Sequence, residues 1–252
     1  MAEPQEKSAW PQPPRRRGRA RQTQRRPART LSRAAIVDAA IRVLDAEGLD
    51  ALTMRRVAEE LGTGPASLYA HVADKDEMVN TVLDRIFSEV TIPDPIDPKR
   101  WQEQLKELAR SGRATFNRHR DVARASLGNI PTGEGALPGM NAMVGILLAG
   151  GVSPTVASLS VDILALYLTA TAYEESLEAF PTDEEGSEQF HTELKSFFAS
   201  LPADRFPHLV AMAEPLTSGD GDHRFEFGLD LLVRGIASTV NPAEARPKRS
   251  AH

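Results

Sequence analysis

Residues 53–72 read TMRRVAEELGTGPASLYAHV, the pattern of two short helices joined by a glycine turn. Thr53 can cap the first helix, because its hydroxyl can accept a hydrogen bond from an amide of the first turn. Gly62 suits the end of that helix, where a left-handed residue is needed. Pro65 suits the first position of the second helix, since its missing donor would be unpaired there anyway. This order predicts a helix-turn-helix, with the second helix reaching His71.

The second helix is short and has a polar outer face. Such a helix can enter the major groove of DNA and bring its N-terminal residues to the base edges. The alternative is an ordinary helical hairpin, because chance matches to short motifs are frequent. Beyond it, Asp74 followed by Glu77 resembles a capping box and predicts a further helix from Lys75. Lys75 would then lie at the positive end of that helix, well placed for a phosphate.

These residues resemble the DNA-binding region of the tetracycline-repressor-type (TetR/AcrR) family of transcription factors. The resemblance covers residues 52–75 and is strongest in LYAHV, 68–72, followed by Asp74 and Lys75. The family pattern is an aromatic residue, any residue, a histidine or phenylalanine, and then a lysine that opens the fourth helix. Because this pattern is highly specific, the resemblance implies a DNA-binding transcription regulator.

The resemblance also implies roles for individual residues. The residues expected to hold phosphates, fixing register without reading sequence, are Thr53, Arg55, Tyr69, His71 and Lys75. The residues expected to face the bases are Pro65, Ala66, Ser67 and Ala70. Their small side chains favour contact with thymine methyls and hydroxyl hydrogen bonds over bidentate reading. Arg55 is the candidate for a bidentate grip on a guanine.

The bulk composition bounds the class of protein. The chain has 252 residues, enough for one or two domains with a real core, and 41% of them are hydrophobic. No continuous apolar run reaches the roughly 18 residues that cross a bilayer, and the N-terminus lacks the apolar core of a signal peptide. There is no cysteine, which excludes disulfides and thiolate metal sites. These features predict a cytoplasmic protein that does not act at a membrane.

Charge divides the chain unevenly. Residues 1–33 carry ten Lys and Arg and two Glu, whereas the other residues carry 20 basic and 33 acidic side chains. An acidic body repels DNA, so contact is expected only at a local basic surface. Residues 1–30 are rich in Pro, Arg and Gln and cannot bury enough apolar surface to fold alone. They are either a solubilising tail or an arm that neutralises phosphates or enters the minor groove. The arm is favoured because it leads directly into the helix-turn-helix.

The fold class predicted is all-α with two domains. The DNA-binding domain is expected over residues 31–92, with a first helix capped by Ser32 and a fourth over 75–90. A C-terminal domain is expected over residues 98–240 and a polar tail over 241–252. Prolines 93, 95 and 98 mark the boundary. The C-terminal helices predicted from apolar spacing and breakers are 101–118, 140–149, 154–180, 188–200, 204–213 and 225–237, with a loop over 130–139.

The C-terminal half also resembles that of the tetracycline repressors, though more loosely. The similar segments are His119-Arg120-Asp121, Leu127-Gly128, Pro131 and the last helix, FEFGLDLLVRGI, 225–236. The resemblance implies a ligand pocket and a dimer interface in this domain.

A pocket is expected between the helices 101–118, 140–149 and 154–180. Its candidate residues are Leu108, Ser126, Asn129, Met143, Tyr173 and Glu174. Leu108 stands where those repressors have a drug-binding asparagine, and Ser126 where they have a magnesium-binding histidine. Both departures remove polar partners, so an apolar or amphipathic small molecule is expected in place of magnesium–tetracycline. No metal or cofactor is predicted.

Catalytic patterns are weak throughout the sequence. The six histidines form no pair four residues apart, as two ligands on one helix would need, and no phosphate-binding loop or nucleophile elbow is found. The sequence therefore predicts a regulator and no enzyme, most simply a repressor that binds a near-palindromic operator as a homodimer and is released by a small molecule. The alternatives are a ligand-independent regulator or activator of the same fold and, more remotely, a sequence-independent DNA-coating protein or a small α-helical enzyme.

Overall fold

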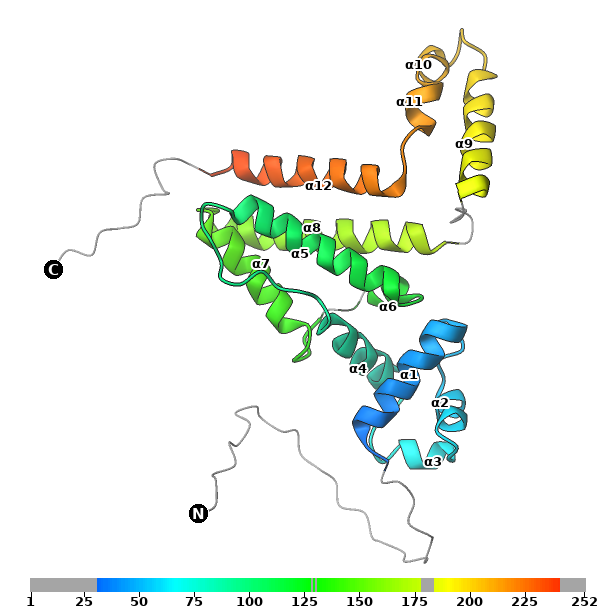
Figure 1. Ribbon diagram of the computed structural model, residues 1–252, viewed down its shortest axis with the longest axis vertical. Helices are drawn as coiled ribbons and strands as arrows, with labels where there is room; N and C mark the ends of the chain where they lie inside the picture. Colours follow the sequence, from blue (N-terminus) through cyan, green and yellow to red (C-terminus); the bar gives the residue numbers. More distant parts are fainter. Residues whose placement is uncertain (1–30, 128, 130, 178–183, 241–252) are drawn as a thin grey trace, which may run out of the picture. The chain divides into compact units, whose positions relative to one another are not determined.

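The computed structural model describes residues 31–127, 129, 131–177 and 184–240, and every regular element in these ranges is a helix (Figure 1). The all-α prediction is therefore confirmed. The predicted arm, 1–30, and the predicted tail, 241–252, lie outside the described residues.

Four helices form the N-terminal part, and three of them begin at a capping side chain. The Ser32 hydroxyl accepts from the Ala35 amide at 3.1 Å, and the Asp74 carboxylate accepts from the Glu77 amide at 2.8 Å. The capping prediction at Asp74 is confirmed, with Glu77 in turn accepting from a backbone amide just before the helix. The helices are α1 (Arg33–Glu47), α2 (Met54–Glu60), α3 (Pro65–Leu68) and α4 (Lys75–Phe87).

Two of these helices are shorter than predicted. α3 ends at Leu68 where His71 was expected, because the His71 amide turns back to the Leu68 carbonyl at 2.8 Å in a tighter turn. α4 ends at Phe87 where Val90 was expected. There the Val90 amide bonds the Phe87 carbonyl at 3.1 Å, three residues back, so the last turn tightens out of the α-helix.

The core of the N-terminal part is small and dry. Ala58 is completely buried where α2 meets α3, so two short helices can approach closely there. The other fully or almost fully buried side chains come from every helix of this part: Ile36, Val43, Leu44, Val57, Leu68, Met78, Val82 and Ile86. Burial of roughly 1.5–3 kcal/mol per large apolar side chain is what holds the four short helices together.

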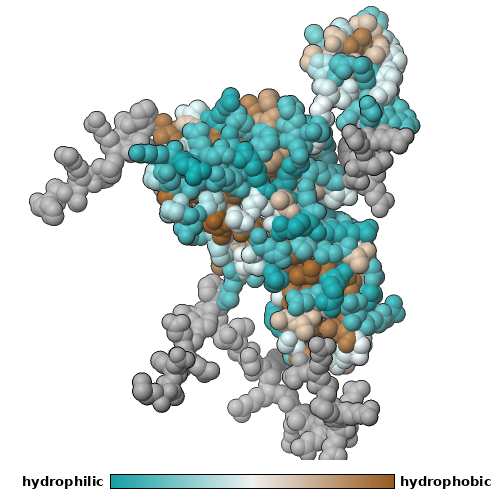
Figure 2. Space-filling view, viewed as in Figure 1, coloured by the Kyte–Doolittle hydropathy of each residue, from teal (hydrophilic) through white to brown (hydrophobic). Residues whose placement is uncertain are grey.

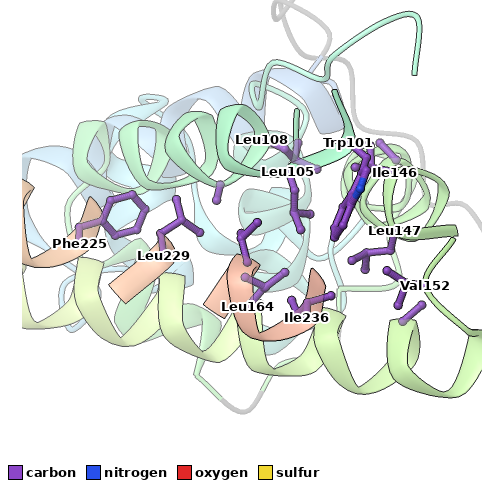
Figure 3. Packing of buried hydrophobic residues seen from close by; sticks show 14 residues of the cluster. Trp101, Leu105, Leu108, Ile146, Leu147, Val152, Leu164, Phe225, Leu229 and Ile236 are labelled. Carbon is purple, nitrogen blue, oxygen red and sulfur yellow. The ribbon is translucent and has the colours of Figure 1, made fainter. Parts of the chain in front are cut away.

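The C-terminal part is built around α5, which contacts α7, α8 and α12. Its core side chains interdigitate between these helices, as Trp101, Leu105, Ile146, Leu164 and Leu229 show (Figure 3). The helices are α5 (Trp101–Arg118), α6 (Val122–Ser126), α7 (Leu137–Ala149), α8 (Pro154–Ser176), α9 (Glu184–Ala199), α10 (Pro207–Ala211), α11 (Ala213–Thr217) and α12 (Gly221–Ser238).

Several predicted bounds in this part are wrong. No helix was predicted over residues 122–126, where α6 forms, and α7 begins at Leu137 inside the loop predicted over 130–139. The helix predicted over 204–213 is two five-residue helices, α10 and α11. Pro215 explains the break, because its ring nitrogen has no hydrogen to donate to a carbonyl of the turn before it. α12 begins four residues before Phe225, since Asp220 caps it by accepting from the His223 amide at 2.7 Å.

α8 is long and apolar enough to cross a membrane by length and composition alone, with a mean hydropathy of 1.5. The helix instead packs on α5, α6, α7 and α12, so it is a packing helix of this fold. The face of the molecule in Figure 2 is mostly hydrophilic, with apolar surface confined to separate patches.

Candidate DNA-binding surface and ligand cavity

The helix-turn-helix forms as the sequence predicts. The Thr53 hydroxyl caps α2 by accepting from the Arg56 amide at 3.1 Å. Gly62 has φ +64°, the left-handed conformation that favours glycine, and it turns the chain toward α3. The Thr63 amide then bonds the Ala58 carbonyl at 2.9 Å, which closes the end of α2. These contacts therefore fix the position of α3 relative to α2.

The residues predicted to meet DNA are mostly exposed on α3 and beside it. The exposed ones on α3 and directly after it are Pro65, Ala66, Tyr69 and Ala70, with Tyr69 56% exposed. Ser67 is half-buried, and its hydroxyl lies 3.2 Å from that of Thr63. His71 is also half-buried. More than half of the surface of Tyr69 is therefore open to a partner.

Three of the candidate residues belong to α2, its N-cap or α4. Lys75 is exposed at the first position of α4, where the helix dipole is positive. Arg55 on α2 is 83% exposed, and it forms a long ion pair of 3.7 Å with Glu59. Thr53 is half-buried by its capping role. The nine DNA candidates thus lie between the N-cap of α2 and the first residue of α4, on α2, on α3 and in the turn that follows α3.

Arg56, beside Arg55, is occupied by the fold. Its guanidinium bonds Glu47 of α1 at 2.6 Å and Glu60 at 3.2 Å, and the hydrogen bond with Glu47 does most to raise the pKa of Arg56. Glu60 in turn bonds Arg42 of α1, and the bonds from Arg42 and Arg56 lower the pKa of Glu60. This network ties α2 to α1 and leaves Arg55 as the exposed arginine of α2 that can reach DNA.

An apolar cavity of about 200 Å³ lies between α4, α5, α7 and α8. It includes four of the six predicted ligand residues, namely Leu108, Ser126, Asn129 and Met143. Most other lining side chains are apolar, and Thr169 is the further polar one. The remaining residues of the lining are Phe87, Val90, Ala109, Gly112, Phe116, Pro131, Ala136, Gly139, Met140, Val161, Leu164, Ala165 and Leu168.

Tyr173 and Glu174 do not line this cavity. The Glu174 carboxylate pairs with Arg224 of α12 at 3.4 Å, and Tyr173 is half-buried one turn beyond the lining residue Thr169. Their part in ligand binding stays a prediction. The sequence reading missed Phe87, which comes from the DNA-binding part, and Phe116. The spacing of Leu108, Gly112 and Phe116, four residues apart on α5, was a signal for this wall.

The two parts meet at α6 through polar contacts. The Asp121 carboxylate accepts from the Leu49 amide at 2.8 Å, and Arg124 bonds both oxygens of Asp50 at 3.0 and 2.9 Å. The hydrogen bond from Arg124 is the main cause of the lowered pKa of Asp50. Asp121 has φ +59°, an unusual conformation for a residue with a side chain. Asp121 therefore joins the end of α1 to the start of α6.

Each ring nitrogen of His119 in the C-terminal part lies near a carboxylate of the N-terminal part. Its Nδ1 is 3.1 Å from Asp45 of α1, and its Nε2 is 3.2 Å from Glu89. Burial alone would raise the pKa of Glu89, but the bonds to His119 and Arg118 outweigh it, and the pKa is lowered. Glu89 lies two residues beyond the end of α4, and His119 caps the end of α5, so α1, α4 and α5 meet near this histidine.

Comparison with protein families matches both parts of the chain. A model described as bacterial regulatory proteins, tetR family, matches residues 36–82, and a tetracyclin repressor-like C-terminal domain matches residues 94–240. The second match covers more than half of the chain, and the first contains both helices of the helix-turn-helix.

Solved structures and curated proteins agree with these matches. ActR from Streptomyces coelicolor, in its apo crystal structure, is 42% identical with a TM-score of 0.78, over 86% of this chain and 99% of that one. The complex of ActR with actinorhodin has a TM-score of 0.79 at the same identity, over 86% of this chain and 100% of that one.

Among curated proteins, the HTH-type transcriptional repressor DrrR1 of Streptomyces coeruleorubidus is 30% identical over 86% of this chain and 83% of that protein. The class D tetracycline repressor protein of Escherichia coli is 26% identical over 82% and 89%. The chain belongs to the tetR family of bacterial regulatory proteins and is a ligand-responsive, DNA-binding transcriptional repressor.

Proposed function

We propose that this repressor acts in the cytoplasm as a homodimer on a near-palindromic operator and is released by an apolar or amphipathic small molecule. The observation that carries the proposal is the apolar cavity, which is walled by the ligand-domain helices α5, α7 and α8 and also by Phe87 of α4. A molecule that fills it would touch the helix that leads to the DNA-binding surface. A regulator of this kind needs no catalytic step.

The homodimer is supported by apolar stripes on α8 and α12. Leu159, Ile163 and Leu166 recur at helical spacing on α8 and are 61%, 48% and 58% exposed. Phe227 and Leu231, one turn apart on α12, are 61% and 54% exposed. Two adjoining apolar stripes of this kind mark an interface, and a second copy offers the same stripes for a symmetric pairing.

Operator recognition is proposed to divide between phosphate and base contacts. Tyr69, Arg55 and Lys75, with Thr53 and His71, would hold phosphates, which sets the register. The residues proposed to face the bases are Pro65, Ala66, Ser67 and Ala70. Their small side chains would read thymine methyls and single acceptors, so specificity depends on groove shape and close fit more than on bidentate pairs.

The effector is proposed to be an apolar or amphipathic compound. The cavity offers Ser126, Asn129 and Thr169 as its polar side chains, too few for the metal-bound face of tetracycline. ActR has been crystallised with actinorhodin, and that compound is therefore the first probe. A cavity of about 200 Å³ is smaller than the ~300–1,000 Å³ of usual ligand pockets, so binding would require the walls to move apart. Such a movement would reach α4 through Phe87.

The experiment begins with selection of bound duplexes from random DNA. A two-fold symmetric site should emerge, and sedimentation should show two protomers on it. Tyr69→Ala should weaken binding about tenfold or more to every duplex alike, because a phosphate contact carries no sequence information. Equal affinity for unrelated duplexes, with no symmetric site, would support the DNA-coating alternative instead.

Release is then measured by fluorescence anisotropy on the selected duplex. Actinorhodin should release the protein, and magnesium–tetracycline at the same concentration should not. Release by magnesium–tetracycline would contradict the proposed chemistry of the cavity. Removing residues 1–30 should flatten the slope of log affinity against log salt by about 0.9 for each phosphate that those residues neutralise, with the preferred site unchanged. An unchanged slope would make those residues a passive tail.

A further inference from the structure

The start of α7 is capped by a side chain from α4. Oδ1 of Asp84 accepts from the Gly135 amide at 2.9 Å and from the Ala136 amide at 3.0 Å. α7 has no capping hydrogen bond from its own N-cap residue, Ala136. The first amides of a helix need such acceptors, because the helix itself supplies none for them. A residue of the DNA-binding part therefore completes a helix of the ligand-binding part.

Two glycines make this approach possible. A Cβ atom on Gly135 would lie 2.1 Å from the Asp84 carbonyl oxygen, which is backbone and cannot swing aside. A Cβ atom on Gly133 would lie 2.0 Å from Oδ1 of Asp84. A side chain at position 135 would therefore push the loop away from α4, and one at position 133 would displace the Asp84 carboxylate. The close contact therefore depends on Asp84 in α4 and on the two glycines in the loop before α7.

Asp84 stands between the two functional sites. On its own helix, Lys75 is the residue proposed to hold a phosphate. Beyond the cap, the first turns of α7 supply Ala136, Gly139 and Met140 to the wall of the apolar cavity. The Ala136 amide bonded by Asp84 thus belongs to a residue of the cavity wall.

The geometry points to Asp84 as the positioning residue through which α4 and the cavity wall sense each other, an inference that rests on the proposed function above. DNA that fixes α4 also fixes Asp84, which stabilises the capped start of α7. By linkage, a molecule that displaces the first turn of α7 weakens the hold on α4 and hence on DNA. Phe87 is the other contact between α4 and the cavity wall, and its ring centroid lies 5.6 Å from that of Phe116. This contact is apolar, so a displaced wall can shift Phe87 by steric contact but breaks no hydrogen bond there.

The coupling is measurable without an effector, by hydrogen exchange of the backbone amides. A cleft of about 400 Å³, lined by Asp84, Gly133 and Ala136 among others, adjoins the cap. The probe is the DNA duplex selected from random sequence, and its binding is first established by anisotropy. Exchange at residues 133–140 is then followed by mass spectrometry with and without the duplex. In the wild type the duplex should slow exchange about fivefold or more, the lower end of usual allosteric couplings.

The variants separate the cap from general stability. Asp84→Ala should raise exchange without DNA and abolish the slowing caused by the duplex. Asp84→Asn keeps an oxygen that can accept from both amides, so the duplex should slow exchange in this variant nearly as much as in the wild type. Glu134→Ala removes an exposed carboxylate from the same cleft and should behave as the wild type. If the duplex is bound but exchange at 133–140 is unchanged, or if Asp84→Ala keeps the slowing, the inference is wrong. If no duplex is bound specifically, the proposed function itself fails.

Discussion

The helices that carry DNA contacts and the helices that surround the cavity are held in different ways. α1, α2 and α4 each begin at their own capping side chain, and the turn between α2 and α3 is closed by Gly62. Of the helices around the cavity, α8 begins at its own capping residue, Ser153, but α5 and α7 have no such cap, and α7 takes its acceptor from α4. Local interactions keep the shape of an element when its surroundings move. The starts of α1, α2 and α4 are therefore held by neighbours in the sequence, whereas the start of α7 depends on a contact with another helix.

Disruption of the proposed dimer interface should have the largest effect. Leu231→Glu places a charge on the exposed stripe of α12, where burial in a dimer would leave it unpaired. The folded protomer should persist, because Leu231 is exposed in it, but operator affinity should fall by about 100-fold or more, as ~3–5 kcal/mol is lost. Sedimentation and anisotropy measure the two effects. Leu148→Glu, also an exposed leucine but on α7, is the control and should remain dimeric. A dimeric Leu231→Glu protein would rule out this interface.

The next largest effect is expected at a junction of three helices. Arg113 of α5 has only 14% of its side chain exposed and bonds Glu175 of α8 at 2.5 Å and Asp222 of α12 at 2.7 Å. Arg113→Met should cost about 3 kcal/mol of unfolding free energy, because Glu175 would keep a partly buried charge. Urea denaturation measures it. Arg100→Met, which removes the exposed pair with Glu107, should cost less than about 1 kcal/mol. Equal losses of unfolding free energy in the two variants would mean that the ion pairs at this junction stabilise the fold no more than an exposed pair does.

Helix starts that are held by local contacts could be predicted from the sequence, and those held by distant contacts could not. The start of α4 was predictable because Asp74 and Glu77 sit three residues apart and act locally. The start of α7 was not, because its cap comes from Asp84, about 50 residues earlier in the chain. The cavity was predicted in part for the same reason. Leu108 and Met143 follow from helix faces, whereas Phe87 enters from the other half of the protein.

Glu174 shows the limit of alignment along a helix. Neighbouring residues on an α-helix point about 100° apart, so a shift of one residue changes the helix that a side chain faces. Glu175 bonds Arg113 of α5, whereas Glu174 pairs with Arg224 of α12. The resemblance aligns Glu174 with a ligand-binding glutamate of the tetracycline repressors only to within one residue, so it cannot decide which of the two carboxylates faces a ligand.

A smaller effect is expected from a local cap. Asp74→Ala removes the acceptor of the Glu77 amide and should cost about 1 kcal/mol, as the removal of an N-cap usually does. The change should appear as faster amide exchange in the first turn of α4, with the exchange of α7 unchanged. Spread of the effect into α7 would show that α4 is not held locally at this end. Asp74→Asn, which keeps an acceptor, should retain most of the stability.

The smallest effect concerns pH at the contact between the halves. The pKa of Glu89 is lowered in the fold, so its contribution to stability is present above the ordinary pKa, about 4.3, and is lost as the pH falls through the folded value. Glu89→Gln should therefore be less stable than the wild type at pH 7 and should approach it near pH 3. Urea denaturation at both pH values measures the two gaps. A gap that does not narrow in acid would mean that the bonds with His119 and Arg118 contribute no stability.

The hairpin formed by α9, α10 and α11 has a consequence for the evolution of this repressor. These helices make their main contacts with one another, and Lys195 of α9 pairs with Glu214 of α11. Because little of the central core depends on it, the hairpin can open as a separate cooperative unit at a fraction of the global unfolding free energy. Substitutions there are under weak selection for core stability. Among relatives, its length and sequence can therefore diverge faster than those of α5 or α12 while the fold persists.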